Sequence, residues 1–264
     1  MGFTDNVFTE MDARIEDVLL RSSVYEDEED YEKMQRHILY WLDNLKGCTG
    51  SVEEALLRNE LVTCCRMTGD CENAMVNIEK CLLLLNEAGD TEQAAAVKIY
   101  TNCATALCSF GEQEEAIRLF NKARDICREA SFVEPELVGA LYNNMGVAYC
   151  DMENYKKAYK MHERAIDIMR TVPGGGLEQA VAYLNIVNTI EKDKLEEDAT
   201  GTLGSSIPEL IEKAYRLIAE ALVPKDSYYA GICRKCSRVF IRHGYFKEGQ
   251  ELLNVSRDIL GRKA

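Results

Sequence analysis

Proline, histidine and tryptophan are scarce in this sequence. Its 264 residues include four prolines, three histidines and one tryptophan, with seventeen glycines. So few prolines permit long helices, the strong helix formers Leu, Ala, Glu, Lys and Met dominate, and a many-turned β fold is excluded. No run of about 18 uncharged apolar residues occurs, so no membrane span is predicted. The first twelve residues lack a basic segment followed by an apolar one, so we predict no secretory signal and expect a cytoplasmic protein.

Positive charge is in deficit overall, although it is not evenly distributed. The net charge of −14 disfavours nucleic acid or an anionic membrane as a partner. Residues 1–35 carry eleven acidic and three basic side chains, a net of −8. Residues 225–264 carry nine basic and four acidic side chains, a net of +5. The two ends of the chain should therefore differ in electrostatic potential.

Cysteine is plentiful, with eleven residues. In the absence of a signal sequence we expect reduced thiols, most of them packed as small apolar groups at helical positions: Cys81, Cys103, Cys108, Cys127 and Cys150.

The pair Cys233 and Cys236 has the Cys-x-x-Cys spacing of a zinc or redox site. His243 could add a third ligand, but no fourth is evident, and no strand pattern supports a redox fold. We therefore predict no metal and no cofactor.

The chain contains an internal repeat with a period of about 42 residues, within the range of helical-repeat proteins. Three ungapped segments align at residues 65–74, 107–116 and 149–158. Each has an apolar helix end, a short polar turn and a small residue that opens the next apolar stripe. A second small residue follows seven positions later, two helical turns away on the same face. The pairs are Ala74/Cys81, Ala116/Ala123 and Ala158/Ala165, with further versions at Ala214/Ala221, Gly249/Ser256 and, in bulky form, Met34/Trp41.

The pattern resembles the tetratricopeptide repeat family. Residues 144–149, Asn-Met-Gly-Val-Ala-Tyr, are similar to that family's Asn-Leu-Gly-x-x-Tyr signature, and Ala116, Phe120 and Ala123 match its second helix. The period is longer than that family's usual one of about 34 residues, as in the kinesin-light-chain-like and peptide-sensor variants. His162, Ile78 and Leu253 replace the expected aromatic residue. The resemblance implies an all-α, right-handed superhelical solenoid of antiparallel helix pairs, with about twelve helices.

We expect one domain over residues 1–264. Residues 1–50 should form an N-terminal capping pair with an acidic turn at residues 26–30, and residues 51–264 should form the repeats. Residues 194–207 are an insertion of fourteen residues relative to the 42-residue period. We predict that they form a loop between the two helices of one repeat. Pro135 and Pro208 suit the first turns of helices, and Ser206 with Glu209 reads as a capping box.

Motifs of catalysis are missing. The three histidines, His37, His162 and His243, fall in different repeats, and there is no phosphate-binding loop, nucleophile elbow or His-Glu-x-x-His. We therefore do not expect an enzyme.

Asparagine recurs in the first helix of successive repeats. Asn102, Asn144 and Asn185 follow one another at almost the repeat period, and asparagine is a poor residue for the interior of a helix. The resemblance places first helices on a concave groove, where such amides could read a peptide backbone; alternatively they only bond neighbouring helices. Lys98 lies one turn before Asn102, and Arg234, Arg238 and Arg242 form a stripe at the groove end that could bind an acidic side chain or a C-terminal carboxylate.

The sequence therefore predicts a non-enzymatic scaffold that binds a protein or an extended peptide in its groove. The alternative is a ligand- or peptide-responsive regulator that lacks its own DNA-binding domain, because the N-terminus is acidic and too short to hold one.

Overall fold

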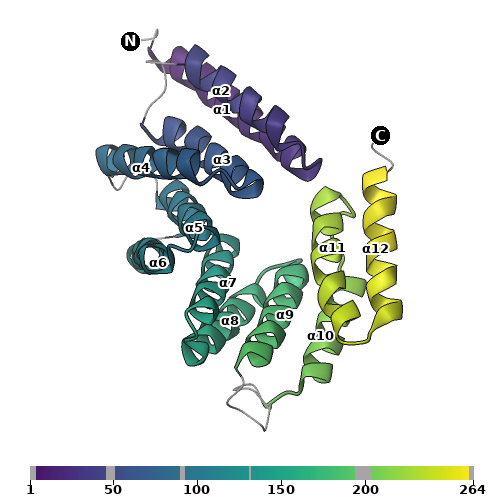
Figure 1. Cartoon of the computed structure of the whole chain (residues 1–264). Helices are drawn as coiled ribbons and strands as arrows, with labels where there is room; N and C mark the ends of the chain where they lie inside the picture. The colour runs from purple at the N-terminus through teal and green to yellow at the C-terminus, as the bar shows by residue number, and fades with distance from the viewer. Residues whose placement is uncertain (1–3, 46–50, 90–92, 131, 194–203, 262–264) are drawn as a thin grey trace. The chain divides into compact units, whose positions relative to one another are not determined.

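A computed structural model describes residues 4–45, 51–89, 93–130, 132–193 and 204–261. In these residues the chain forms twelve α-helices and no strand, as the sequence predicts (Figure 1). None of these helices has the length and the apolar character needed to cross a bilayer. The internal contacts divide the chain into two compact units, Met1–Ala130 and Ser131–Ala264. The expectation of a single domain stays a prediction.

The first unit contains three consecutive helix pairs. The helices are α1 (Thr4–Asp27), α2 (Tyr31–Asn44), α3 (Ser51–Thr68), α4 (Cys71–Ala88), α5 (Gln93–Ser109) and α6 (Gln113–Glu129). The second helix of each pair packs on the first, and α3 also contacts α5. The pair α1/α2 lies where the N-terminal pair is predicted, and its acidic turn, residues 28–30, is shorter than the predicted 26–30 because α1 continues to Asp27.

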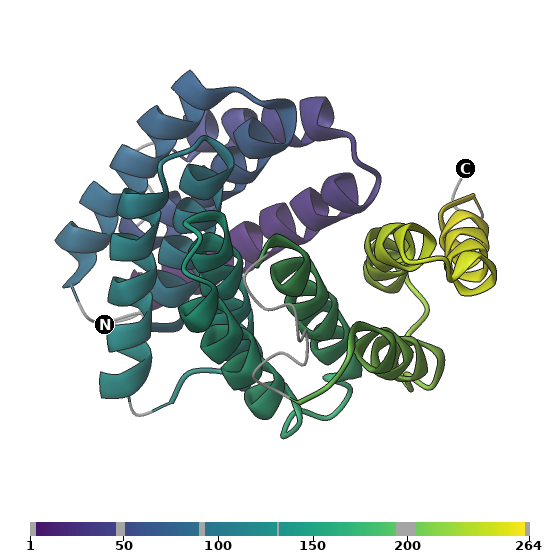
Figure 2. The same ribbon diagram turned by 60° about the horizontal axis from the view of Figure 1, so that its bottom comes forward.

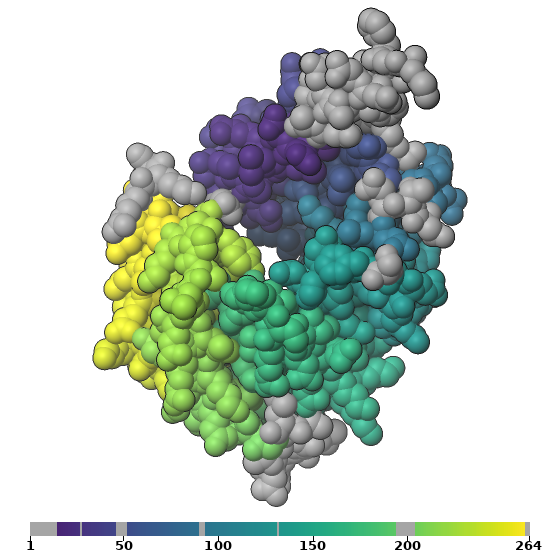
Figure 3. Space-filling model, turned by 180° about the vertical axis from the view of Figure 1, so that it is seen from behind, coloured from purple at the N-terminus to yellow at the C-terminus, as the bar shows by residue number. Residues whose placement is uncertain are grey.

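The second unit also contains three helix pairs. Its helices are α7 (Pro135–Asp151), α8 (Tyr155–Met169), α9 (Gly176–Lys192), α10 (Ile207–Ala219), α11 (Ser227–Arg242) and α12 (Phe246–Gly261). The first helices again contact one another, α7 with α9 and α9 with α11. Figure 2 shows α11 and α12 nearly end-on as a packed pair, and Figure 3 shows the same two helices side by side on the surface in yellow-green and yellow.

Small residues allow the two helices of a pair to approach closely. Nearly all the predicted positions are buried: Ala74, Cys81, Ala116, Ala123, Ala158, Ala165, Ala214, Gly249 and Ser256. A Cβ atom added at Gly249 would lie 2.6 Å from Ile241 Cγ1 and 3.2 Å from the Ser237 carbonyl oxygen, so α11 leaves no room for one. The expectation for Ala221 is wrong, because α10 already ends at Ala219 and the chain leaves the helix ahead of Pro224.

The turns inside the pairs also repeat. Gly69, Gly111 and Glu153 occupy equivalent positions in three successive repeats and adopt positive φ angles of 76°, 88° and 57°, the left-handed conformation that ends many helices. The next residue then caps the second helix in two of these turns. Asp70 accepts the backbone N–H of Asn73, and Asn154 accepts that of residue 157.

The long insertion lies between α9 and α10, the two helices of one pair, but its residues 194–203 fall outside the described residues. The predicted loop is one residue too long at its end, because Ile207 already belongs to α10. The backbone N–H of Ser206 donates to Glu209 Oε2 at 2.8 Å, as expected for a capping box. Pro135 opens α7 and Pro208 lies in the first turn of α10, as predicted.

Candidate functional site

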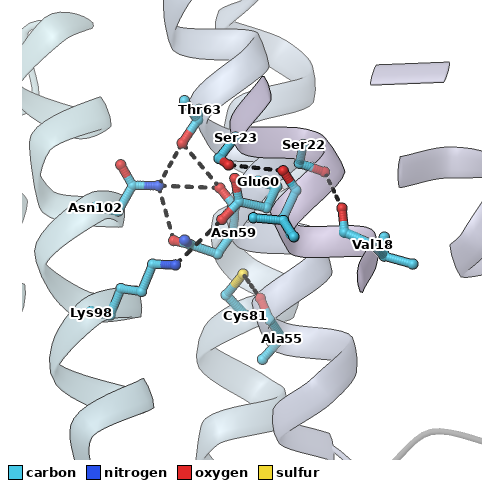
Figure 4. A network of polar contacts seen from close by, with 11 residues as sticks. Val18, Ser22, Ser23, Ala55, Asn59, Glu60, Thr63, Cys81, Lys98 and Asn102 are labelled. Carbon is cyan, nitrogen blue, oxygen red and sulfur yellow. Dashed lines mark hydrogen bonds and ion pairs between the residues drawn. The ribbon is translucent and has the colours of Figure 1, made fainter. Parts of the chain in front are cut away.

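In the first unit, Asn102 joins two neighbouring first helices. Its Nδ2 lies 3.1 Å from the Asn59 carbonyl oxygen, 2.9 Å from Asn59 Oδ1 and 3.0 Å from Thr63 Oγ1, so α5 donates to α3 (Figure 4). Asn59 and Thr63 are buried. The Asn102 amide group therefore supplies a donor to buried acceptors on α3, in addition to the bond that Thr63 Oγ1 donates to the Asn59 carbonyl oxygen.

Lys98 also faces α3. Its ammonium nitrogen lies 3.6 Å from Glu60 Oε1, and the Glu60 side chain is only 10% exposed (Figure 4). Burial raises the pKa of Glu60, and the charge of Lys98 opposes that rise. Lys98 therefore compensates a buried carboxylate inside the protein, a role that the sequence did not predict for it.

In the second unit, an amide chain connects three helices. Asn185 Nδ2 on α9 donates to Asn143 Oδ1 on α7 at 3.0 Å. The same oxygen lies 3.1 Å from Nδ1 of His162 on α8. Because Asn143 Oδ1 accepts from the Asn185 amide, it also accepts from the imidazole, which places the His162 proton on Nδ1.

His162 is completely buried, and its ring packs against the backbone of residue 146. A Cβ atom at residue 146 would lie 2.6 Å from Nδ1 and 2.7 Å from Nε2, so the ring fits only because residue 146 is glycine. Burial lowers the pKa of His162 to about 3, so the ring is neutral at physiological pH. Nε2 is buried without a hydrogen-bond partner among the described residues.

Asn144 differs from Asn102 and Asn185, the other two members of the predicted series. Its side chain is half-buried, and no hydrogen bond involves it within the described part of the chain. Asn143 and Asn144 are about 100° apart around the helix. That rotation decides which of the two faces the neighbouring helix.

These contacts show that two amides of the predicted ladder bond neighbouring helices. The amide nitrogens of Asn102 and Asn185 donate to acceptors on α3 and α7, of which Asn59 is buried and Asn143 is half-buried. The alternative that the amides bond neighbouring helices is therefore the one that the geometry supports at these two positions. Whether a partner also contacts Asn102, Asn144 or Asn185 stays a prediction.

The predicted basic stripe lies on α11, and its last member crosses to α9. Arg242 donates to Asn188 Oδ1 and, at 2.7 Å, to Glu191 Oε2. His243 Nε2 lies 3.1 Å from the other carboxylate oxygen of Glu191. Arg238 is exposed and Arg234 is half-buried.

A second ion pair joins α9 to α7. Lys192 Nζ lies 2.8 Å from Asp151 Oδ1. Successive first helices in this unit are thus tied by charged groups near their C-terminal ends.

These groups surround a hollow of about 290 Å³ between α7, α8, α9 and α11. Most of its lining residues carry polar groups, including charges of both signs, although the larger share of the surface that they turn toward the hollow is apolar. It brings together two predicted site residues, Asn185 and Arg242, with eight that sequence reasoning did not select: Val147, Cys150, Asp151, His162, Asn188, Thr189, Glu191 and Lys192. One signal was available, because His162 stands where the repeat expects an aromatic residue.

The surroundings of the cysteines indicate a role in packing and not in redox chemistry or metal binding. The ten cysteines in the described residues are free thiols, and Cys48 lies outside those residues. Cys233 and Cys236 are both buried within α11, and burial raises the pKa of Cys236 to about 12, which disfavours the thiolate. The described residues contain no cluster of three or more His, Cys, Asp or Glu suited to a metal ion.

Several solved structures share the fold. BtubC (BKLC) from P. vanneervenii is 14% identical, with 91% of this chain and 90% of that chain covered and a TM-score of 0.54. The apo form of RapI is 12% identical over 94% of this chain and 66% of that chain, with a TM-score of 0.59. NprR, solved with its cognate peptide NprX, is 15% identical over 96% and 71%, with a TM-score of 0.57.

Sequence comparison gives a family but no individual relative. Among curated protein sequences, none matches the chain significantly. The family model for the tetratricopeptide repeat matches residues 53–129 and 137–191. These two segments include nearly all of α3 to α9, and together they make up half of the chain. With its all-α fold of antiparallel helix pairs, the chain belongs to the tetratricopeptide repeat family.

Proposed function

We propose that the chain is a non-enzymatic interaction module that binds an extended peptide or a peptide segment of a partner protein. One observation carries the proposal: the first helices α7, α9 and α11, together with α8, bound a hollow whose lining residues include hydrogen-bond donors and acceptors. One residue of a bound peptide that enters this hollow would meet groups that can donate to it and accept from it, while the rest of the peptide lies outside the hollow. The peptide-bound structure of NprR, which has the same fold, gives further support.

The charge of α11 suggests what else the partner carries. Arg238 lies one helical turn before Arg242, on the same side of α11, and its side chain is exposed. A peptide seated in the hollow would therefore have an exposed guanidinium group beside it. An acidic side chain or a C-terminal carboxylate at one end of the peptide is the complementary group. Because the net charge is −14, nucleic acid and anionic membranes are not proposed as partners, and a cytoplasmic location is part of the same proposal.

A displayed library of random octapeptides tests this function. Selection on the wild-type chain should yield peptides that are rich in Asp or Glu or that bind through a free C-terminal carboxylate. Their affinity for the chain should fall as the salt concentration rises. Substitution of Arg238 with Gln should reduce their affinity by about 2- to 5-fold, because exposed charge pairs contribute modestly. Substitution of Arg118, an exposed residue on α6 whose pair with Glu115 stays within its own helix, serves as the matched control.

Two results would contradict the proposal. One is a library that yields no binder. The other is a set of binders whose affinities are equally insensitive to Arg238→Gln and to filling of the hollow by Val147→Phe.

A further inference from the structure

The hollow of the second unit becomes more enclosed with depth. His162 forms part of its base and is fully buried, together with the buried side chains of Cys150 and Thr189. Asn185 and Asn188 form the half-buried middle of the wall. The charged residues lie at the mouth, where their side chains are 32% to 52% exposed. A volume of about 290 Å³ suits a single side chain better than a whole ligand.

The base of the hollow offers an unused acceptor. His162 Nδ1 donates to Asn143 Oδ1, so Nε2 carries the lone pair of a neutral imidazole. No described residue donates to it, and a buried polar atom without a partner costs free energy. Nε2 has almost no contact with solvent. A ligand therefore reaches it only if side chains at the base, such as Cys150, rotate as the ligand enters.

At the mouth of the hollow, each basic side chain is paired with an acidic one. Lys192 pairs with Asp151 at 2.8 Å, and Arg242 pairs with Glu191 at 2.7 Å. A ligand carboxylate would have to displace one of these acids and would meet the lone pair of His162 rather than a proton. A ligand ammonium group would lose its hydration in a narrow space whose basic groups already satisfy the acids. The hollow therefore favours an uncharged group.

From this arrangement we infer that the hollow is a specificity pocket for an uncharged primary carboxamide, the side chain of glutamine or asparagine. The amide N–H donates to His162 Nε2, and the amide oxygen accepts from the remaining N–H groups of Lys192 or Asn188 near the mouth. A carboxamide satisfies an acceptor and a donor at once, which neither a carboxylate nor a methyl group can do. The inference rests on the proposed peptide-binding function and adds the identity of one side chain.

Capped amino acids test the pocket without any knowledge of the natural partner. The probes are N-acetylglutamine N-methylamide, the matching glutamate compound and the matching methionine compound, which share a backbone and differ at the side-chain end. They are titrated into the full chain at neutral pH while the ¹⁵N signals of His162 are followed by NMR. The glutamine probe should move the Nε2 signal and bind about tenfold more tightly than the other two, since each leaves a polar group unpaired.

Two variants separate the pocket from other surfaces. Val147→Phe places a ring at the mouth from an exposed position on α7, and it should abolish the response to the glutamine probe. Leu222→Phe changes a fully exposed residue in the α10–α11 connection, and it should leave the response intact. His162→Phe keeps an aromatic ring, slightly larger than imidazole, but removes Nε2, so glutamine should lose its advantage over methionine. Because this variant has no imidazole signal, the binding of the two probes is followed on the backbone NMR signals of α9.

The inference is overturned if the three probes bind equally, if none binds, or if Val147→Phe leaves the glutamine response unchanged. These outcomes differ from failure of the proposed function. If octapeptides bind but the glutamine probe has no advantage, the peptide-binding function stands and the pocket assignment fails. If the glutamine probe binds as expected and no octapeptide does, the pocket stands and the peptide-binding function fails.

Discussion

Gly146 and His162 fit together as one structural unit, because the imidazole ring occupies the space that any side chain at residue 146 would need. The two residues belong to α7 and α8, the helices of one pair. The repeat signature expects glycine at residue 146, and the chain uses the resulting space for a histidine in place of the usual aromatic residue.

Substitution of Gly146 with Ala should destabilise the protein. A Cβ atom would stand 2.7 Å from His162 Nε2 and closer still to Cε1, so the ring must move within a packed core, which costs about 1–3 kcal/mol. This cost should exceed the gain of up to about 1 kcal/mol from removing a glycine from a helix. The free energy of unfolding from urea titration is the measurement.

Gly231→Ala is the matched control for this change. Gly231 lies inside α11, and a Cβ atom there would meet nothing within 4 Å. This variant should be stabilised by about 0.5–1 kcal/mol. A Gly146→Ala variant that is also stabilised would show that the ring moves aside freely.

The buried imidazole should make the unfolding free energy depend on pH. The pKa of His162 is lowered from 6.5 to about 3, so between these values the unfolded chain binds one more proton at this residue than the folded chain. The stability contribution is therefore complete above pH 6.5 and is lost as the pH falls toward 3. Relative to His162→Phe, the wild-type free energy of unfolding should fall by up to about 1.4 kcal/mol per pH unit in this range.

Carboxylates also titrate at these pH values, but they are present in both proteins, so the difference between the two curves isolates His162. Chemical denaturation at half-unit steps from pH 7.5 to 4.5 suffices. Parallel curves would mean that His162 is protonated in the folded state or is exposed to water.

Much of the fold can be predicted from the internal repeat. The small residues Ala116, Ala123, Ala158 and Ala165 mark close contacts between helices, and all four are buried. The site follows from it less well. The repeat also relates Asn143 to Asn185, yet the sequence does not reveal that Asn143 rather than Asn144 turns toward α9. A rotation of about 100° between adjacent helical residues decides this, and only the packing of α7 on α9 fixes it. The pairing of Lys98 with Glu60 likewise depends on how α5 lies on α3.

Substitution of Ala158 with Leu should test the packing of the repeat directly. Ala158 is fully buried near the start of α8, and three extra carbon atoms should overpack the contact at a cost of about 1–3 kcal/mol. Lys156→Leu adds the same side chain at an exposed position of the same helix, and it should change the unfolding free energy by less than about 0.5 kcal/mol. Equal stability of the two variants would contradict the close approach of α7 and α8.

The last prediction uses the different environments of Asn102 and Asn144, which occupy one slot in successive repeats. Asn102→Ala should destabilise the chain by about 1–2 kcal/mol, because it leaves Asn59 Oδ1 and Thr63 Oγ1 without their donor in the interior between α3 and α5. Asn144→Ala removes an amide that bonds no described residue, and it should change the free energy of unfolding by less than about 0.5 kcal/mol.

The same two variants distinguish a structural amide from one that binds a ligand. If Asn144 contacts the partner, Asn144→Ala should weaken the selected octapeptides while its urea midpoint stays at the wild-type value. Asn102→Ala should show the reverse, a lower midpoint with peptide affinity unchanged under conditions where the chain remains folded. Equal losses of stability in the two variants would mean that Asn144 also bonds a neighbouring helix, and the division between the two roles would then be wrong.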